Sequence, residues 1–157
     1  MLKKFLFFNL IILILTSCGY SPMLSDNTNL KFGVTSYEFS GNRQINNLIE
    51  AKLSKFLTNS NDKRFKIKIK TNQKSISTAK DTTGRVTNLK IITNLELTYI
   101  KENLENDNQE KTITFSESLN IIKNENNYEQ DKYEKIVIEN MSELLFNKLT
   151  LFLSRVQ

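Results

Sequence analysis

Residues 64–70 read Arg-Phe-Lys-Ile-Lys-Ile-Lys, the most regular alternation of apolar and charged residues in the chain. Successive side chains of a β-strand point to opposite faces of the sheet, so Phe65, Ile67 and Ile69 share one face and the four cations share the other. This pattern predicts a half-buried strand, which we expect to run over residues 64–77. The sheet that contains it should be covered on one side.

Further strands and helices are expected on both sides of this strand. Alternating apolar residues predict strands near residues 30–39, 86–101 and 111–122. Apolar residues three and four positions apart predict amphipathic helices over residues 43–58 and 129–154. The residues expected to face the core are Leu30, Phe32, Val34, Ile45, Leu48, Ile49, Leu53, Phe56, Leu57, Leu89, Ile91, Leu95, Leu97, Tyr99, Ile113, Phe115, Leu119, Ile121, Tyr133, Ile136, Val137, Met141, Leu144, Leu145, Leu149 and Phe152.

The order β-α-β-β-β-α defines the expected fold class. Asn42 is a suitable N-cap for the first helix, and polar segments at residues 80–84, 103–110 and 124–127 separate the later elements. All apolar faces are buried if both helices pack on one face of a mixed four-stranded sheet. We therefore predict an α/β two-layer sandwich at residues 30–157, with a right-handed parallel crossover followed by an antiparallel meander.

The first residues have the features of a secretory signal. Lys3 and Lys4 precede an apolar run of signal-peptide length, which is too short to span a membrane as a helix. The run ends in Leu-Thr-Ser-Cys at residues 15–18, an aliphatic residue and two small residues before a cysteine. We expect a lipoprotein signal peptide at residues 1–17, lipidation (palmitate) at Cys18 and a lipidated tether at residues 18–29. The alternatives are an uncleaved anchor helix, or a plain signal with an incidental cysteine.

Gly19, in place of an aspartate, favours the outer membrane by the sorting rule of enteric bacteria. We expect a lipid-anchored protein on the periplasmic side of that membrane.

Composition argues against enzymatic chemistry. The chain has no histidine and a single cysteine, so neither a zinc site nor the commonest general base is available. Its four glycines form no nucleotide-binding pattern, and no spacing among serines and lysines marks a Ser/Lys dyad. Loss of Lys3 and Lys4 with the signal lowers the formal net charge from +5 to +3. We expect no catalysis, cofactor, metal or nucleic-acid partner.

The expected mature N-terminus, Cys-Gly-Tyr-Ser-Pro-Met-Leu at residues 18–24, resembles that of a known family. Lipopolysaccharide-assembly lipoproteins of the LptE (RlpB) family, alphaproteobacterial type, commonly open Cys-Gly-Phe-x-Pro-Leu-Tyr. This chain departs from that opening at Tyr20, Met23 and Leu24. The resemblance implies a two-layer α/β domain inside the lumen of an outer-membrane β-barrel translocon (LptD-like). It also implies a plug and assembly chaperone that contacts lipopolysaccharide and does no catalysis.

Two groups of cations are candidates for binding lipopolysaccharide, whose phosphates are anionic. The first is the charged strand face, where cations two residues apart would lie about 6.6 Å from one another; its members are Arg64, Lys66, Lys68 and Lys70, with Lys63 and Lys74 beside them. The second is the turn between Lys80 and Arg85. The alternatives are a solvated face, an edge strand whose lysines block aggregation, and an ordinary turn.

Two other functions remain open for a small periplasmic lipoprotein of this kind. One is an accessory lipoprotein of an ABC-type lipid transporter, and the other is a lipoprotein activator of a peptidoglycan synthase. Neither accounts for the Cys-Gly-aromatic-x-Pro opening.

Overall fold

The computed structural model describes residues 32–58, 63–102 and 109–156. The expected signal peptide, Cys18, the tether, Leu30 and most of the 103–110 loop lie outside these residues. The elements are β1 (Gly33–Gly41), α2 (Arg43–Leu53), the 3₁₀ turn η2 (Ser54–Phe56), β2 (Arg64–Lys80), β3 (Val86–Lys101), β4 (Lys111–Ile122) and α3 (Asn127–Arg155).

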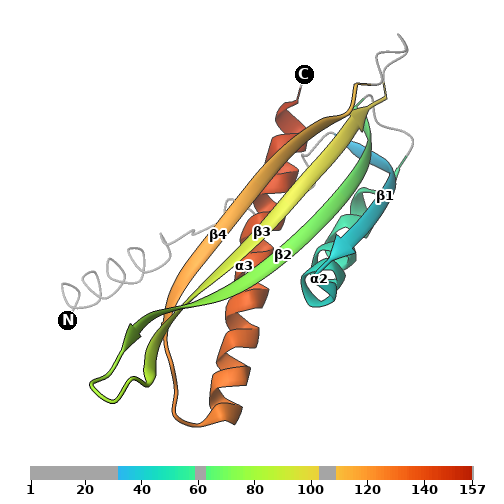
Figure 1. The fold of residues 1–157 in the computed structure, drawn as a ribbon. Coiled ribbons are helices and arrows are strands. Elements are labelled where there is room, and N and C mark those ends of the chain that lie inside the picture. Colours follow the sequence, from blue (N-terminus) through green and yellow to red (C-terminus); the bar gives the residue numbers. More distant parts are fainter. Residues whose placement is uncertain (1–31, 59–62, 103–108, 157) are drawn as a thin grey trace, which may run out of the picture.

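The four strands form one mixed sheet in the order β1-β2-β3-β4. β1 is parallel to β2, and β2, β3 and β4 form an antiparallel meander. Both helices cover the same face of the sheet, with α2 beside β1 and the long α3 behind β3 and β4 (Figure 1). The predicted fold class, the element order and the one-sided cover are confirmed.

The core between helices and sheet divides into two clusters of unequal size. The larger cluster holds seventeen buried residues, among them Phe65, Leu97 and Leu149, and lies where α2 and α3 both cover the strands. The smaller holds Ile91, Ile121, Val137 and Met141, with Leu89 partly buried beside it. β2 and β3 run on beyond β1 (Figure 1). The smaller cluster lies beneath β3 and β4 there and holds no residue of β2, whose residues 74–80 are exposed.

A glycine and a capped helix N-terminus form the junction between β1 and α2. Gly41 has φ +94°, and a Cβ there would collide with the carbonyl oxygen of Thr71 in β2. The chain then enters α2 at Asn42, whose side chain accepts a hydrogen bond from the amide of Ile45 at 3.1 Å, which confirms the expected N-cap.

Buried hydrogen bonds tie this junction to the sheet. The hydroxyl of Thr71 donates to Oδ1 of Asn46 at 2.6 Å and accepts from the amide of Asn42 at 3.1 Å. Nδ2 of Asn46 donates to the carbonyl of Ser40 at 3.1 Å. Two polar residues of the core are thereby satisfied, as buried polar groups require.

The first helix ends earlier than predicted. The expected helix over residues 43–58 stops at Leu53, a 3₁₀ turn follows, and Leu57 is extended and bridges to Val34. Leu57 is exposed and Leu48 half-buried, so neither belongs to the core. The chain has to reverse there to reach β2, and this requirement overrides the helical spacing.

The buried face of α3 is also rotated from the prediction. Tyr133, Ile136 and Leu144 are 45–51% exposed, whereas Ile138, Phe146 and Leu153 are buried. The helix packs on α2 as well as on the sheet, with Phe146 against Phe56 of η2 at 6.2 Å between ring centroids and Lys52 paired to Glu143 at 2.9 Å. A second packing partner shifts the buried stripe toward α2.

Further boundaries and one further core position differ from expectation. β1 continues to Gly41, β2 to Lys80, and α3 starts at Asn127. The turn after β2 is correspondingly shifted to residues 81–85. Leu119 shares the inner face of β4 but is exposed, because β4 is an edge strand.

Candidate functional site

The cations of β2 lie on the helix-free face of the sheet, as the alternation predicts. Their apolar neighbours Phe65, Ile67 and Ile69 are buried beneath the helices. Lys66, Lys68 and Lys70 are therefore exposed to solvent.

Carboxylates neutralise part of this face. Glu102 forms ion pairs with Lys66 at 3.2 Å and with Arg64 at 4.0 Å, and Glu110 forms one with Lys68 at 3.5 Å. Exposed pairs of this kind contribute at most about 1 kcal/mol, so a polyanion could displace them. Lys70 forms no ion pair within the described residues, but Glu96 lies opposite it on β3. The face is therefore mixed in charge, unlike the cation row expected from the sequence of β2 alone.

Lys63 has a structural partner. Its Nζ donates to the carbonyl of Ser154 at 3.2 Å, in the last turn of α3. A cation at this end of a helix meets unpaired carbonyls and the negative end of the helix dipole. This contact accounts for Lys63 without a ligand.

The β2–β3 turn is ordered by the side chain of Asp81. Its Oδ1 accepts the amide and hydroxyl of Thr83 at 2.8 and 2.7 Å and the amide of Arg85 at 2.9 Å. The hydrogen bond from the Thr83 hydroxyl, followed by that from the Arg85 amide, holds the pKa of Asp81 below its ordinary value. Gly84 supplies the left-handed position of the turn, at φ +83°. The backbone of Arg85 is therefore held in place by the turn.

A hollow lies between this turn and the β4–α3 connection. It has a volume of about 540 Å³, and Arg85 and Lys123 stand in its wall. The register brings the two segments together, since the amide of Lys123 donates to the carbonyl of Thr87 at 2.7 Å. Neither Arg85 nor Lys123 forms an ion pair with any residue that the structure describes.

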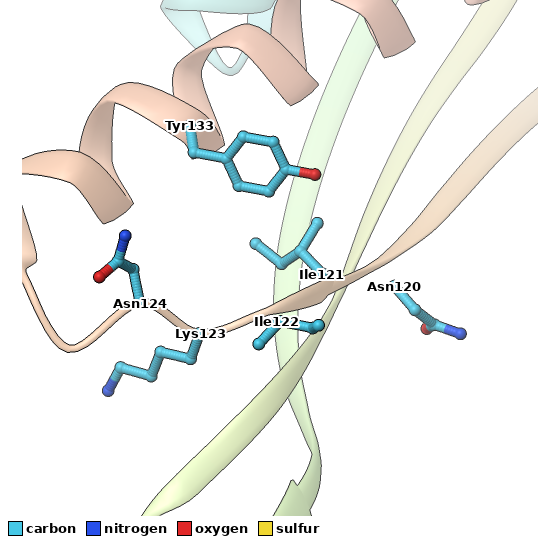
Figure 2. Close-up of a pocket in the computed structure, with 6 residues that line it drawn as sticks. All are labelled: Asn120, Ile121, Ile122, Lys123, Asn124 and Tyr133. Carbon is cyan, nitrogen blue, oxygen red and sulfur yellow. The ribbon is translucent and has the colours of Figure 1, made fainter.

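A second hollow of about 500 Å³ adjoins the first, and Ile122, Lys123 and Asn124 line both. Figure 2 shows Tyr133 of α3 above Ile121, with Ile122 and Lys123 along the end of β4. Ile122 is 76% exposed. We call the two hollows together the tip groove. It combines Arg85 and Lys123, which form no ion pair within the described residues, with the carboxylates of Asp81 and Glu125 and with apolar surface.

Sequence reasoning identified only one side of the tip groove. Arg85 was among the predicted residues, whereas Lys123, Ile122 and Tyr133 were not. Thirty-seven positions separate Arg85 from Lys123 along the chain, and only the pairing of Thr87 with Lys123 places them at one end of the sheet. Lys80 stands at the end of β2 next to the turn, and Lys74 lies exposed within β2.

Over residues 32–58, 63–102 and 109–156, no group of three or more metal-ligating side chains is present. Within the same ranges, no helix has both the length and the apolar character needed to cross a membrane.

The fold resembles that of solved structures. No protein-family model matches the chain, and no curated protein matches its sequence. The crystal structure of rare lipoprotein B from Shewanella oneidensis is similar, with a TM-score of 0.57 and 8% identity over 76% of this chain and 93% of that one. A putative lipoprotein from Caulobacter crescentus gives a TM-score of 0.48 at 10% identity, over 80% of this chain and 89% of that one. The chain therefore has the fold of the Shewanella rare lipoprotein B.

Proposed function

We propose that this chain is an outer-membrane lipoprotein of the LptE type. It is anchored through acyl chains on Cys18, and its domain lies on the periplasmic side. There it assists assembly of an LptD-like β-barrel translocon, plugs the barrel and contacts lipopolysaccharide. The observation that carries the proposal is the fold shared with rare lipoprotein B, and the Cys-Gly-Tyr-Ser-Pro opening supports it.

The tip groove is the strongest candidate for contact with lipopolysaccharide. The ligand presents phosphates close to acyl chains, and the groove presents Arg85 and Lys123 beside the exposed side chain of Ile122. A guanidinium binds phosphate through two parallel hydrogen bonds. Asp81 and Glu125 line the same hollow, but within the described residues neither cation forms an ion pair with them. Lys80 adds a third positive charge near this end of the sheet.

The strand face Arg64–Lys70 makes a second, weaker contribution. Its cations already have Glu102, Glu110 and Glu96 as neighbours, so binding a phosphate exchanges one charge contact for another. We expect this face to add long-range attraction that is screened over a Debye length of about 8 Å at physiological salt.

Glycolipid binding by variants with cations replaced by glutamine tests this ranking. We expect Arg85→Gln with Lys123→Gln to weaken binding of purified lipopolysaccharide by the detergent-solubilised protein more than Lys66→Gln, Lys68→Gln and Lys70→Gln together. The control is Arg43→Gln with Lys55→Gln, two exposed cations far from the groove in sequence and without ion pairs in the described structure. If the control and the groove variants lost equal affinity for lipopolysaccharide, binding would depend on net charge alone and the proposed site would be wrong.

Anchoring and partnership need a separate experiment. Each buried methylene stabilises membrane attachment by about 0.8 kcal/mol, so loss of the acyl chains should release the protein. Cys18→Ser is expected to leave an unprocessed precursor or a soluble form, and the wild type is expected to co-purify with a large outer-membrane β-barrel. Co-purification with an inner-membrane ATPase or with a peptidoglycan synthase would instead select one of the two alternative functions.

A further inference from the structure

Partly exposed apolar side chains follow the boundary between β4 and α3. On β4, Ile121 is buried in the smaller core cluster, and Leu119 is 44% exposed. Both belong to the helix-covered face of the sheet, since they stand two residues apart on one strand. On α3, Tyr133 is 46% exposed and Leu144 is 51% exposed. We call these four residues the β4–α3 strip.

Two contacts fix how α3 runs along β4. Tyr133, in the second turn of the helix, lies above Ile121 near the end of β4 (Figure 2). Further along the helix, Nζ of Lys148 forms an ion pair with Glu117 in the middle of β4, at 2.5 Å. The helix therefore runs in the opposite direction to the strand, and residues that come later in α3 lie beside residues that come earlier in β4.

The ion pair marks the end of the β4–α3 strip that is away from the tip groove. Leu144 lies one turn before Lys148 on the same side of the helix. Leu119 lies two residues after Glu117 on the same face of the strand. Both leucines therefore stand between the ion pair and the tip groove. Tyr133 and Leu144 are eleven positions apart, which corresponds to about 16 Å along the helix axis.

The other end of the strip opens into the tip groove. Tyr133 and Ile121 line the hollow that shares Lys123 with the hollow containing Arg85. The surface thus leads from two cations, over apolar side chains, to an ion pair. This order of charged and apolar surface matches an amphiphile that carries its anionic groups at one end.

We propose that the β4–α3 strip binds one acyl chain of an anionic glycolipid whose phosphates lie in the tip groove. The inference rests on the proposed function and assigns the surface that holds the tail of the lipid. A chain laid over Leu119 and Leu144 removes their exposed apolar surface from water, which favours binding. It should stop before Lys148, because covering the ion pair would take two charges out of water.

The narrow width of the strip favours a single chain over a folded protein segment. Asn140 is exposed on α3, four residues before Leu144 and seven after Tyr133, and borders the strip on its solvent side. A protein partner that covered the whole side of the helix would also cover Lys148 and Leu151, on which the proposed chain does not depend.

Lipopolysaccharide binding by the full-length, detergent-solubilised protein tests the strip. Leu119→Gln and Leu144→Gln each remove an apolar side chain that the acyl chain would cover, so each should weaken binding about three- to tenfold. Leu151→Gln is the matched control, because Leu151 lies on the same side of α3, is 45% exposed and stands beyond the ion pair. It should bind as the wild type does. Equal losses from Leu144→Gln and Leu151→Gln would overturn the proposal.

Lipopolysaccharide stripped of its acyl chains separates this inference from the proposed function. The wild type should bind the stripped form at least about tenfold more weakly, and Leu119→Gln and Leu144→Gln should bind it as the wild type does. Arg85→Gln with Lys123→Gln should weaken binding of both forms. Equal binding of both forms by the wild type would overturn the strip alone, whereas binding of neither would also overturn the proposed contact with lipopolysaccharide.

Co-purification from detergent tests whether a protein covers the strip instead. The double variant Leu119→Gln with Leu144→Gln should retain the outer-membrane β-barrel partner while its affinity for lipopolysaccharide falls. Loss of the barrel with unchanged affinity for lipopolysaccharide would make the strip a protein interface and refute the proposal. A thermal melt of each variant should match that of the wild type, since all three leucines are about half exposed.

Discussion

Thr71 and Thr93 allow one hydrogen bond at the β1–α2 junction to be measured against a matched control. Both are buried on the helix-covered face, Thr71 in β2 and Thr93 in β3. The Thr71 hydroxyl donates to Asn46 at 2.6 Å, whereas among the described residues the Thr93 hydroxyl has only the sulfur of Met141 as a partner, at 4.0 Å. Valine has the shape of threonine without the hydroxyl, so Thr→Val removes the hydrogen bond and keeps the volume.

Only the first of the two substitutions should lower the free energy of unfolding. Thr71→Val leaves Oδ1 of the buried Asn46 without its donor, and an orphaned buried acceptor costs about 1–3 kcal/mol. The amide of Asn42 keeps the Thr71 carbonyl at 3.1 Å, so only one group is orphaned. Thr93→Val removes a hydroxyl with no strong partner and should leave the free energy of unfolding unchanged or raise it by up to about 1 kcal/mol.

Urea denaturation, monitored by circular dichroism, measures the free energy of unfolding of both variants. With a slope of about 1–3 kcal/mol per M, Thr71→Val should lower the midpoint by about 1 M at unchanged slope. Thr71→Val combined with Asn46→Ala should cost less than the sum of the single changes, because the partner is then absent. Equal loss of stability from Thr71→Val and Thr93→Val would refute the argument and assign the effect to packing.

Three further predictions concern the core, the junction and the turn. Leu145→Asp should unfold the domain in a thermal melt, since an unpaired charge on this fully buried side chain costs several kcal/mol; an unchanged melt would mean that α3 is misplaced. Gly41→Ala should lower the free energy of unfolding by more than 1 kcal/mol in urea, because φ is positive and the new Cβ meets the Thr71 carbonyl. Because its folded pKa is depressed, Asp81 should order the turn above about pH 4, its unfolded pKa, and release it as pH falls through the lower folded value. The NMR chemical shift of the Thr83 amide should change with pH as Asp81 titrates, and this change should be absent in Asp81→Asn.

The alternation of apolar and polar residues was sufficient to predict where the strands lie, because each strand has a period of two and one covered face. The bounds of β3 and β4 at residues 86–101 and 111–122 match the prediction, and the alternation of residues 64–70 placed the cations correctly on the open face. The element order then leaves few ways to bury both helices. These are properties of single segments, and a sequence carries them directly.

The errors arise where a second segment decides the outcome. Leu57 has helical spacing, but the path to β2 extends the chain there. Leu144 and Phe146 lie two residues apart on α3, and only contact with Phe56 decides that Phe146 is the buried one. The tip groove depends on the register between Thr87 and Lys123, and the neutralisation of the β2 face depends on Glu102 in another strand. Pairings of this kind are long-range and leave no local pattern.

The division of the core into a large and a small cluster has a consequence for how the molecule opens. Amides near Leu97 and Leu149 should exchange with deuterium only on global unfolding, because the larger cluster must separate first. Amides near Ile91 and Ile121 depend on four buried residues and should exchange through a sub-global opening of lower free energy. The end of the sheet that carries Arg85 and Lys123 can thus loosen and re-form around a ligand while the rest of the domain stays folded.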